Sequence, residues 1–584
     1  MFIRPLAGAL LSLPLSLSCI GMAWSVQDIG RAVEGKEKEK FIRTLPETVD
    51  IDNGDNKAAK SGVRSGVGDE YKLHVVEFII EGESELIDIS KAKEYFINFE
   101  GGDYSFDELQ RIVDDINSTI FDLGYVTSKF YFPPQDVTDG QIIINLMEGV
   151  IDPDDSFSLY SEITNENDNE FLVEYFESKV RGGEILDNEE LEESLLILSD
   201  FPSVTASANL KPGKYENSTK IDFKVKSDDV VNVIASADNY GSRYTGEYRY
   251  IAGVTWNNPT SIKDSLSISL LTTGGMGSQL YGQAKYKYYL GRSGLNLDLS
   301  QSWMSSEFGG VFEPLESQSQ ASVSNIGLSL PLLKKRKGSL DVSLGYERKK
   351  LVDEIMDVRT NERFVDRGAI STNFNFSDGF VSGAYNVGKM TYFNGYIDLT
   401  GIQSAYDADQ APKGAKTHGS FEKITYYYRR IQNLGYGLTA LIDFDGQQAF
   451  NNLNSAEKYS LGGAYGVRAY PDGELSGDNA IRLALDVKYK LPFDVYQTDS
   501  YFYVFYDWGE VERYYDSSEV YLIKKNKVSL QGGGVGFEIN RDSTFSFSIT
   551  GAWQANRDSD YFTEYNSDGT KDRERILAGF SYIF

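Results

Sequence analysis

The stretch LGGAYGVRAYPDGELSGDNA, residues 461–480, stands directly before the clearest β-strand pattern in the chain. Its five glycines and Pro471 make it too irregular for a strand or a helix interior. From Ile481 to Leu491, apolar residues then alternate with mostly charged ones. A strand with two such faces fits lipid on one side and water on the other. The pattern predicts a membrane β-barrel in which residues 461–480 form a loop at the mouth or in the lumen.

The composition of the whole chain agrees with a barrel that carries additional domains. The chain has 584 residues, 39 of them Tyr, 55 Gly and only 14 Pro, which suits many two-faced strands. A net charge of −30 argues against nucleic acid as a partner, because phosphate binding needs a basic face. Past the N-terminus, no apolar run approaches the ~20 residues that a membrane-spanning helix needs.

Residues 1–25 are typical of a secretory signal peptide. Arg4 precedes an apolar segment, and Ala23-Trp24-Ser25 forms a small-x-small cleavage site. A lipoprotein signal ending at Cys19 is the alternative, but Ser16 occupies the position where a bulky aliphatic residue is expected. Cys19 is the only cysteine, so the mature chain would have neither disulfides nor thiolate chemistry.

The next two segments differ in their periodicity. Within residues 26–44, Val26, Ile29 and Val33 share one helical face. The segment is either a frayed, solvated helix or a detachable helix that inserts into a polar environment. Residues 45–70 are polar and lack periodicity, which predicts a flexible linker.

Two α+β units follow. Residues 71–150 read as a βααββ unit whose second helix begins with a capping box, Ser105-x-x-Glu108. Residues 151–227 repeat the plan with another sequence, and Asp187 begins the second helix there. The expected strands are 74–80, 126–132, 141–148, 157–160, 204–210 and 219–226, and the other two helices are expected near 90–99 and at 169–180. A sheet edge in so small a unit can accept an extra strand from a partner.

Residues 228–584 contain short alternating runs and no convincing helix. At ~22 residues per strand plus loop, this region predicts about 16 strands. A soluble β-sandwich is the alternative. Lipid is favoured because aromatic clusters at 286–289 and 426–428 resemble interfacial girdles at strand ends. Lipid is also favoured because the chain ends on a strand, 576–584, with a terminal Phe584 like that of bacterial outer-membrane barrels.

Several motifs resemble one family, the two-partner secretion transporters. Residues 238–246, DNYGSRYTG, resemble the entry to their barrel. Residues 124–128, GYVTS, with PPQD at 133–136 and Glu148-Gly149, resemble their first POTRA domain. Val467-Arg468-Ala469-Tyr470 resembles their VRGY loop motif. Residues 505–509, FYDWG, resemble the FxDxG strand motif of the wider superfamily of POTRA-bearing outer-membrane barrels. The order and spacing of these motifs are more specific than any one of them.

The resemblance implies a mostly β protein with a role for each segment. Residues 26–44 would be a plug helix, and residues 71–150 and 151–227 would be periplasmic POTRA domains 1 and 2. Residues 228–584 would be a 16-stranded transmembrane β-barrel in the bacterial outer membrane, with the lumenal loop 461–480. The barrel would conduct an unfolded passenger, a large secreted exoprotein that the POTRA domains recognise.

The resemblance also implies a pairing between loop and wall. Arg468 would pair with Asp507 as a latch, with Val467, Ala469 and Tyr470 in the loop motif and Phe505 and Gly509 in the strand motif. Without the resemblance, an ordinary solvated Arg and a strand-end Asp would be the better interpretation, since exposed pairs contribute only ~0–1 kcal/mol. Ala469 replaces the family's glycine. If that glycine has a positive φ, alanine would cost on the order of 1 kcal/mol.

The remaining expectations concern partners and chemistry. The partners would be the passenger exoprotein, outer-membrane lipid and the barrel-assembly machinery, and the protein would be a monomer. No cofactor or metal is expected, because His74 and His418 have no metal-ligand spacing. No enzyme is expected, since there is no GxxxxGK[ST] motif and no credible Ser-His-Asp set. The alternatives are a barrel-assembly insertase of the same superfamily and a plain porin or surface receptor.

Overall fold

The computed structural model describes residues 51–52 and 72–584, except 83, 85–87, 123–124, 126, 138, 216, 228–229, 493–496, 519, 521–524, 542–543, 557–560 and 563. The expected signal peptide, the plug helix and all of the linker but two residues lie outside the described residues. The described chain forms two compact units, one up to residue 228 and one from residue 229 onward. In the described part, no helix is both long and apolar enough to cross a membrane.

The first α+β segment has a three-stranded sheet under two helices. Its elements are β2 (Leu73–His74), β3 (Glu77–Glu81), α3 (Ile89–Ile97), β4 (Asp103–Tyr104), α4 (Phe106–Asp122), β5 (Lys129–Tyr131) and β6 (Gln141–Met147). The strand order is β3–β6–β5, with β3 parallel and β5 antiparallel to β6. The apolar faces of both helices pack on this sheet, in a core that includes Phe96, Val113 and Ile144. The short pair β2–β4 was not expected from the sequence.

The predicted capping box of α4 forms. The amide of Glu108 donates to Ser105 Oγ at 3.2 Å, and the amide of Ser105 donates to Glu108 Oε2 at 2.8 Å. These two bonds satisfy two amides at the first turn that would otherwise lack partners. The carboxylate at the helix N-terminus therefore has a lowered pKa, chiefly through the Ser105 backbone amide. The residues expected to close the helix, 123–124, lie outside the described part.

The second α+β segment comprises β7 (Val150–Ile151), β8 (Phe157–Ser161), α5 (Glu166–Glu177), α6 (Asn188–Ser199), β9 (Val204–Pro212) and β10 (Ser218–Ser227). Helix α5 begins three residues before the expected 169, because Asn165 caps it by accepting from the Asn167 amide. Asp187 caps α6 in the same way, by accepting from the Glu189 amide at 2.8 Å. The outer edge of β9 pairs in parallel with β1 (Ile51–Asp52), which comes from the segment expected to be linker.

Sixteen strands form the closed barrel, as the sequence predicted. They are β11 (Val231–Asp238), β12 (Tyr248–Asn257), β13 (Asp264–Gly274), β14 (Ser278–Tyr289), β15 (Asn296–Glu307), β16 (Gln318–Lys335), β17 (Gly338–Ile355), β18 (Val358–Asp378), β19 (Ala384–Asp398), β20 (Gly419–Gly435), β21 (Leu438–Ala449), β24 (Asn479–Lys490), β25 (Asp499–Glu512), β26 (Lys527–Arg541), β27 (Phe545–Asn556) and β28 (Glu574–Ile583).

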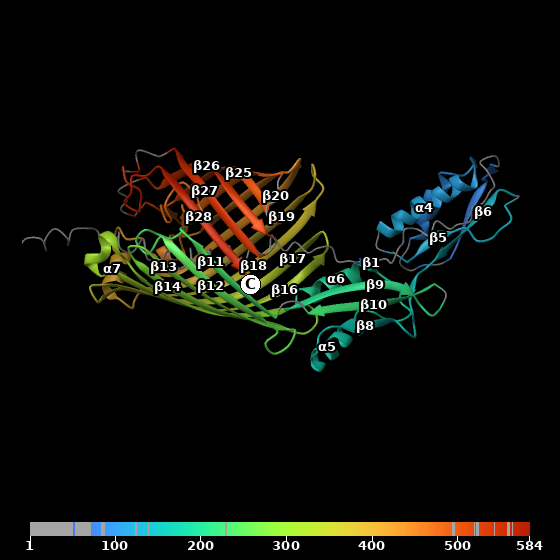
Figure 1. Cartoon of the computed structure of the whole chain (residues 1–584), viewed down its shortest axis with the longest axis horizontal. Coiled ribbons are helices and arrows are strands. Elements are labelled where there is room, and N and C mark those ends of the chain that lie inside the picture. Colours follow the sequence, from blue (N-terminus) through green and yellow to red (C-terminus); the bar gives the residue numbers. More distant parts are fainter. Residues whose placement is uncertain are drawn as a thin grey trace, which may run out of the picture. The chain divides into compact units, whose positions relative to one another are not determined.

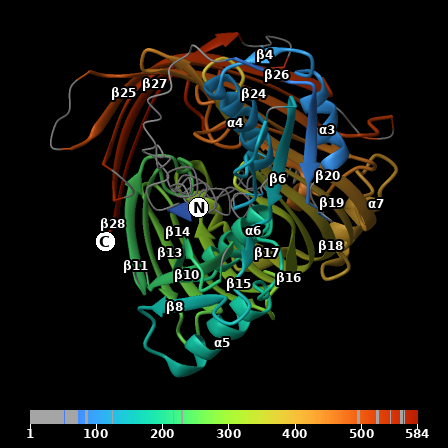
Figure 2. The same cartoon turned by 90° about the vertical axis from the view of Figure 1, so that its right-hand side faces the viewer.

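Each barrel strand pairs antiparallel with the next, and β28 returns to β11 (Figure 1). This closing ladder joins only Ile234–Asp238 to Gly579–Ile583. Asn239 extends it, since its Nδ2 donates to the carbonyl of Ile576 and its Oδ1 accepts from the amide of Ala578, both at 2.8 Å. The end-on view shows the strands curving into a continuous wall (Figure 2).

The two faces of the wall differ as a barrel in lipid requires. Large apolar side chains such as Trp256, Leu270, Trp303 and Leu344 are exposed on the outside. The cluster 286–289 ends β14, as expected of a girdle. The cluster 426–428 lies in the middle of β20, so its placement at a strand end was wrong. Strand β20 has 17 residues, more than the ~10 needed to span the bilayer, so it extends well beyond its aromatic cluster.

The barrel region also contains helices that the sequence did not indicate. Helix α7 (Gln403–Gln410) lies in the connection between β19 and β20, beyond the strand ends (Figure 1). A 3₁₀ turn, η1 (Gly310–Leu315), follows β15, and a second, η2 (Ser455–Glu457), follows β21. The longest of these has 8 residues and a polar composition, which leaves no apolar periodicity to detect.

Candidate functional site

The connection between β21 and β24, residues 450–478, is folded into the barrel lumen; we call it the lumenal loop. It contains η2 and a small hairpin of β22 (Tyr459–Leu461) and β23 (Leu475–Gly477). Its side chains and carbonyls contact inward-facing groups on β12, β17, β18, β20, β24, β25 and β27. Only a segment inside the ring can reach strands so widely spaced round the wall. The predicted loop 461–480 covers its C-terminal two thirds and the first two residues of β24.

Arg468 bridges two carboxylates on the lumenal wall; we call this arrangement the Arg468 fork. Its Nη2 and Nε donate to Asp507 at 2.6 and 2.8 Å, and its backbone amide donates to the same carboxylate at 3.0 Å. Its Nη2 and Nη1 also donate to Asp486 at 2.6 and 3.1 Å. Asp507, on β25, is fully buried. The sequence predicted the contact between Arg468 and Asp507. It did not predict the contact with Asp486, on β24, which it indicated only as part of the charged face of that strand.

The other residues of the two motifs shape the seat of the fork. The ring of Phe505 lies under the guanidinium, with its centroid 3.6 Å from Arg468 Cζ. Gly509 leaves room for the hairpin, because a Cβ there would come within 2.6 Å of a Leu461 methyl carbon. Val467 and Tyr470 are fully buried in the apolar cluster between loop and wall. The loop motif thus combines a charged anchor with apolar packing.

Ala469 does not have a positive φ, so the expected backbone strain is wrong. Its side chain is fully buried and faces Gly532 on β26. An added Cβ at Gly532 would lie 2.5 Å from the Ala469 Cβ. The wall glycine therefore makes the space that the loop alanine fills.

This contact predicts that Gly532→Ala destabilises the docked loop by about 1–3 kcal/mol through overpacking. Adding Ala469→Gly to the same chain should restore stability, because it removes the opposing methyl group. The measurement is the unfolding temperature of the purified barrel in detergent. Gly345→Ala, where the nearest atom to a new Cβ is 3.7 Å away, is the control and should change little. A lack of rescue by Ala469→Gly would contradict the paired-volume explanation.

A second anchor, which the sequence did not reveal, is Glu457 in η2. We call Glu457 together with the three cations around it the Glu457 seat. The carboxylate is fully buried and contacts Lys349 Nζ at 2.9 Å, Arg367 Nη1 at 2.7 Å and Lys423 Nζ at 2.8 Å. These cations come from β17, β18 and β20. Burial alone would raise the pKa of Glu457, but Arg367, Lys349 and Lys423 hold it well below its ordinary value. The only signal in the sequence was an acidic residue beside Lys458, too common to predict a site.

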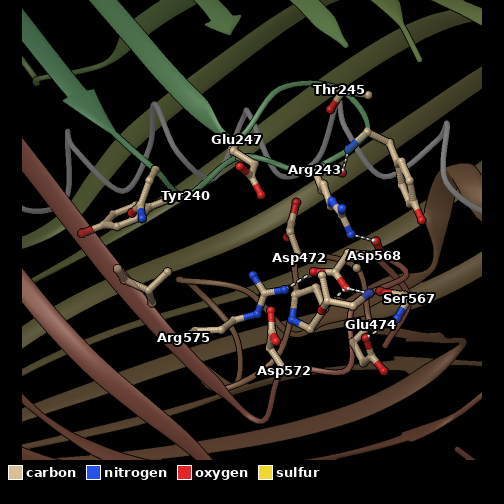
Figure 3. Close-up of a pocket in the computed structure, with 18 of the residues that line it drawn as sticks. Tyr240, Arg243, Thr245, Glu247, Asp472, Glu474, Ser567, Asp568, Asp572 and Arg575 are labelled. Atoms are coloured by element: carbon tan, nitrogen blue, oxygen red, sulfur yellow. Dashed lines mark hydrogen bonds and ion pairs between the residues drawn. The ribbon is translucent and has the colours of Figure 1, made fainter. Parts of the chain in front are cut away.

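The C-terminal part of the lumenal loop contacts the connection between β27 and β28 (Figure 3). Glu474 accepts from the backbone amide of Ser567 at 2.8 Å. In that connection Asp568 forms an ion pair with Arg575, and its carbonyl accepts from Arg243 at 3.3 Å. Arg243, Glu474 and Ser567 line one cavity of about 490 Å³. Arg243 belongs to the stretch 238–246 that resembles a barrel entry, so that motif contributes to the cavity.

The same stretch also begins with a buried ion pair. Asp238 accepts from Arg249 Nε and Nη2 at 2.7 and 3.0 Å, and both side chains are almost fully buried. The ring of Tyr465, in the lumenal loop, lies 5.8 Å from the Arg249 guanidinium carbon. The pair therefore joins the first barrel hairpin to the lumenal loop.

The two histidines have structural contacts. His74 Nδ1 lies 2.8 Å from Asp103, and His418 Nδ1 accepts from the Leu399 amide at 3.2 Å. Within the described ranges, no group of three or more His, Cys, Asp or Glu residues could hold a metal ion.

Two family models match the chain. Residues 217–539 match the haemolysin secretion/activation protein family ShlB/FhaC/HecB, and residues 73–149 match the ShlB-type POTRA domain. The chain is 24% identical over 506 residues to the heme/hemopexin transporter protein HuxB of Haemophilus influenzae (strain 86-028NP). The aligned region covers 85% of this chain and 86% of HuxB. It is 22% identical over 412 residues to the outer membrane transporter CdiB-2 of Burkholderia pseudomallei (strain 1026b). That alignment covers 66% of this chain and 64% of CdiB-2.

Two solved structures share the fold. CdiB from Escherichia coli aligns over 96% of this chain and 97% of its own, with a TM-score of 0.68 and 14% identity. CdiB from Acinetobacter baumannii aligns over 100% of both chains, with a TM-score of 0.62 and 16% identity.

A closed barrel that holds one of its own loops against the inner wall, and that follows α+β segments in the sequence, is the architecture of an outer-membrane transporter. The chain belongs to the haemolysin secretion/activation family ShlB/FhaC/HecB, whose model matches more than half of it. It is therefore a two-partner secretion pore in the outer membrane, which secretes a partner exoprotein, and its POTRA domains lie in the periplasm.

Proposed function

We propose that the lumenal loop is a fixed part of the conduit wall and that Arg468 and Asp507 form the latch that keeps it there. The observation that carries this proposal is the Arg468 fork, with five hydrogen bonds from one residue to two wall carboxylates. Bidentate pairs of arginine with carboxylates combine strength with a defined geometry. While the loop stays docked, the cavity beside it, which inward-facing residues of β14 to β20 line, remains free for the passenger.

A disulfide between loop and wall tests whether the docked loop is compatible with export. The Leu461 methyl carbons lie 2.6 and 2.9 Å from the site of a new Cβ at Gly509, so cysteines at both positions would be within bonding reach. The only natural cysteine, Cys19, lies in the expected signal peptide. We expect Leu461→Cys/Gly509→Cys to release a co-expressed passenger into the medium equally well when oxidised and when reduced, with Leu461→Cys as the control. Export that stops on oxidation would show that the loop must leave the wall.

We further propose that the passenger is recognised by strand addition at the β9 edge of the second α+β segment. This edge already pairs with an extended segment of the chain itself, Ile51↔Ala208 and Asp52↔Asn209. Main-chain hydrogen bonds at such an edge give affinity without requiring one particular sequence. That property suits an unfolded passenger.

Site-specific photocrosslinking tests the edge. A photoreactive residue at the exposed Thr205 on β9 should form an adduct with a passenger arrested during export. The same residue at the exposed Glu177, the last residue of α5, should not. Adducts of equal yield from both positions would contradict edge recognition.

Three further parts of the proposal concern assembly and chemistry. The protein acts as a monomer, which is supported by the closure of its barrel within one chain. It is inserted into lipid by the barrel-assembly machinery, and its export role needs no catalysis or cofactor.

A further inference from the structure

The lumen beside the docked loop holds a cavity of about 750 Å³ whose lining is basic, although the chain as a whole carries a net charge of −30. Seven cationic and three anionic side chains line it, on strands from β14 to β24. In a narrow water-filled lumen with walls of low dielectric, such an imbalance focuses the potential and selects the sign of the charge that enters.

Two of the seven cations are neutralised by the wall itself. Arg429 is paired with Asp443, the shortest contact being 2.5 Å, and Arg482 is paired with Asp445 at 2.9 Å. These pairs belong to β20, β21 and β24, at the border of the lumenal loop. They contribute little net charge to the cavity.

Three more cations are held by carboxylates. Lys349, Arg367 and Lys423 surround Glu457, and Glu347 on β17 lies 2.8 Å from Arg367 and 3.4 Å from Lys349. Two carboxylates therefore face three cations, and one of the two is supplied by the lumenal loop rather than by the wall. The Nε of Arg367 is buried without a hydrogen-bond acceptor, so the cluster retains a donor.

The last two cations, Lys285 on β14 and Lys389 on β19, have no ion pair within the described part of the chain, and they line the same cavity. A lysine without a counter-charge in the lumen can be paired by a mobile anion. With the Glu457 seat, they extend the positive surface over β14 to β20; we call it the basic wall.

Residues 26–44 are not a complementary occupant of the basic wall. They contain five basic and four acidic residues, so their net charge is positive. A polypeptide segment that carries exposed carboxylates is complementary, because Lys and Arg side chains donate charge-assisted hydrogen bonds to it.

We propose that the basic wall binds side-chain carboxylates of the passenger during transit, so that the pore favours anions and acidic segments over basic ones. This inference rests on the proposed conduction of the passenger along β14–β20. Lys285 and Lys389 are the contacts free to exchange, and the Glu457 seat supplies the positive field behind them.

Ion selectivity of the full-length protein in planar bilayers tests the basic wall without a passenger. In a KCl gradient the reversal potential should show preference for chloride. The variant Lys285→Glu/Lys389→Glu should shift it towards potassium, past zero. The control Lys337→Glu/Lys413→Glu makes the same charge change at two exposed residues outside the cavity lining and should leave it unchanged. A deca-glutamate peptide should reduce the wild-type current, whereas a deca-lysine peptide should not.

Each other result overturns the basic wall as a carboxylate-binding surface. These results are a preference for potassium in the wild type, no shift in the Lys285/Lys389 variant, an equal shift in the control, or the absence of any current. Failure of the proposed loop latch is distinguishable, because the disulfide test measures export and does not depend on the sign of the charge that the pore prefers.

Discussion

Replacing Arg468 with alanine should abolish export of the passenger while the barrel remains inserted in the outer membrane. The change removes all side-chain bonds of the Arg468 fork and leaves Asp507 and Asp486 facing each other without a cation. Loss of one partner from a buried ion pair costs about 3–5 kcal/mol. The docked loop would then be disfavoured by roughly a hundredfold or more. Because both ends of the loop stay attached, the released segment moves into the lumen that the passenger needs.

The measurement is passenger released into the medium, normalised to the amount of heat-modifiable barrel in the outer membrane. Arg468→Lys keeps the charge but cannot span two carboxylates with a planar fork, so we expect partial activity. Arg359→Ala, at a half-exposed arginine near the start of β18, is the control. In the Arg468→Ala background, oxidised Leu461→Cys/Gly509→Cys should restore export. Normal export by Arg468→Ala at normal surface levels would refute the latch.

Replacing Glu457 with glutamine should have the second largest effect, a loss of about 3–5 kcal/mol from the stability of the docked loop. The amide leaves Lys349, Arg367 and Lys423 close together with only Glu347 to balance them. The expected observation is a lower unfolding temperature and faster proteolysis between residues 450 and 478. Glu422→Gln, which removes one exposed charge from the same strand as Lys423, should change neither.

A compensating variant separates charge balance from packing. Glu457→Gln/Lys423→Met removes one charge of each sign, so the double variant should be more stable than Glu457→Gln alone. The pH dependence has a defined sign. Since the pKa of Glu457 is depressed by folding, its contribution is complete above the unfolded value of about 4.3 and is lost as the pH falls through the folded value. If the stability of the docked loop already declined between pH 8 and pH 6, the pH dependence could not be attributed to Glu457.

The barrel could be predicted from its sequence because each strand carries its own two-residue period. The even-numbered side chains Asp486 and Lys488 of β24 face polar partners in the lumen, and Leu485 and Val487 point outward. Periodicity reports the environment of one strand at a time. It therefore predicted the two-faced strands and the lumenal face, whereas the number of strands followed from the length of the region.

The same reasoning could not reveal contacts between distant parts of the chain. Glu457 and Lys349 are 108 residues apart, and nothing in either local sequence indicates the other. Asp507 was predicted only because a family motif contains it. For Ala469, a departure from the motif suggested strain, but the compensation lies in Gly532, in another strand. Family motifs name the residues of one contact and not the neighbours that adapt to them.

The closing ladder between β11 and β28 has a consequence for how the protein is made. Asn239 bonds to residues 337 and 339 positions later in the chain, so the ring cannot close before synthesis of the barrel is complete. Contacts of such high sequence separation incur the largest loop-closure entropy and form slowly. Until then, the first and last strands are unpaired edges that invite aggregation. A chain truncated before Glu574 would keep those edges permanently, which makes early degradation its expected fate.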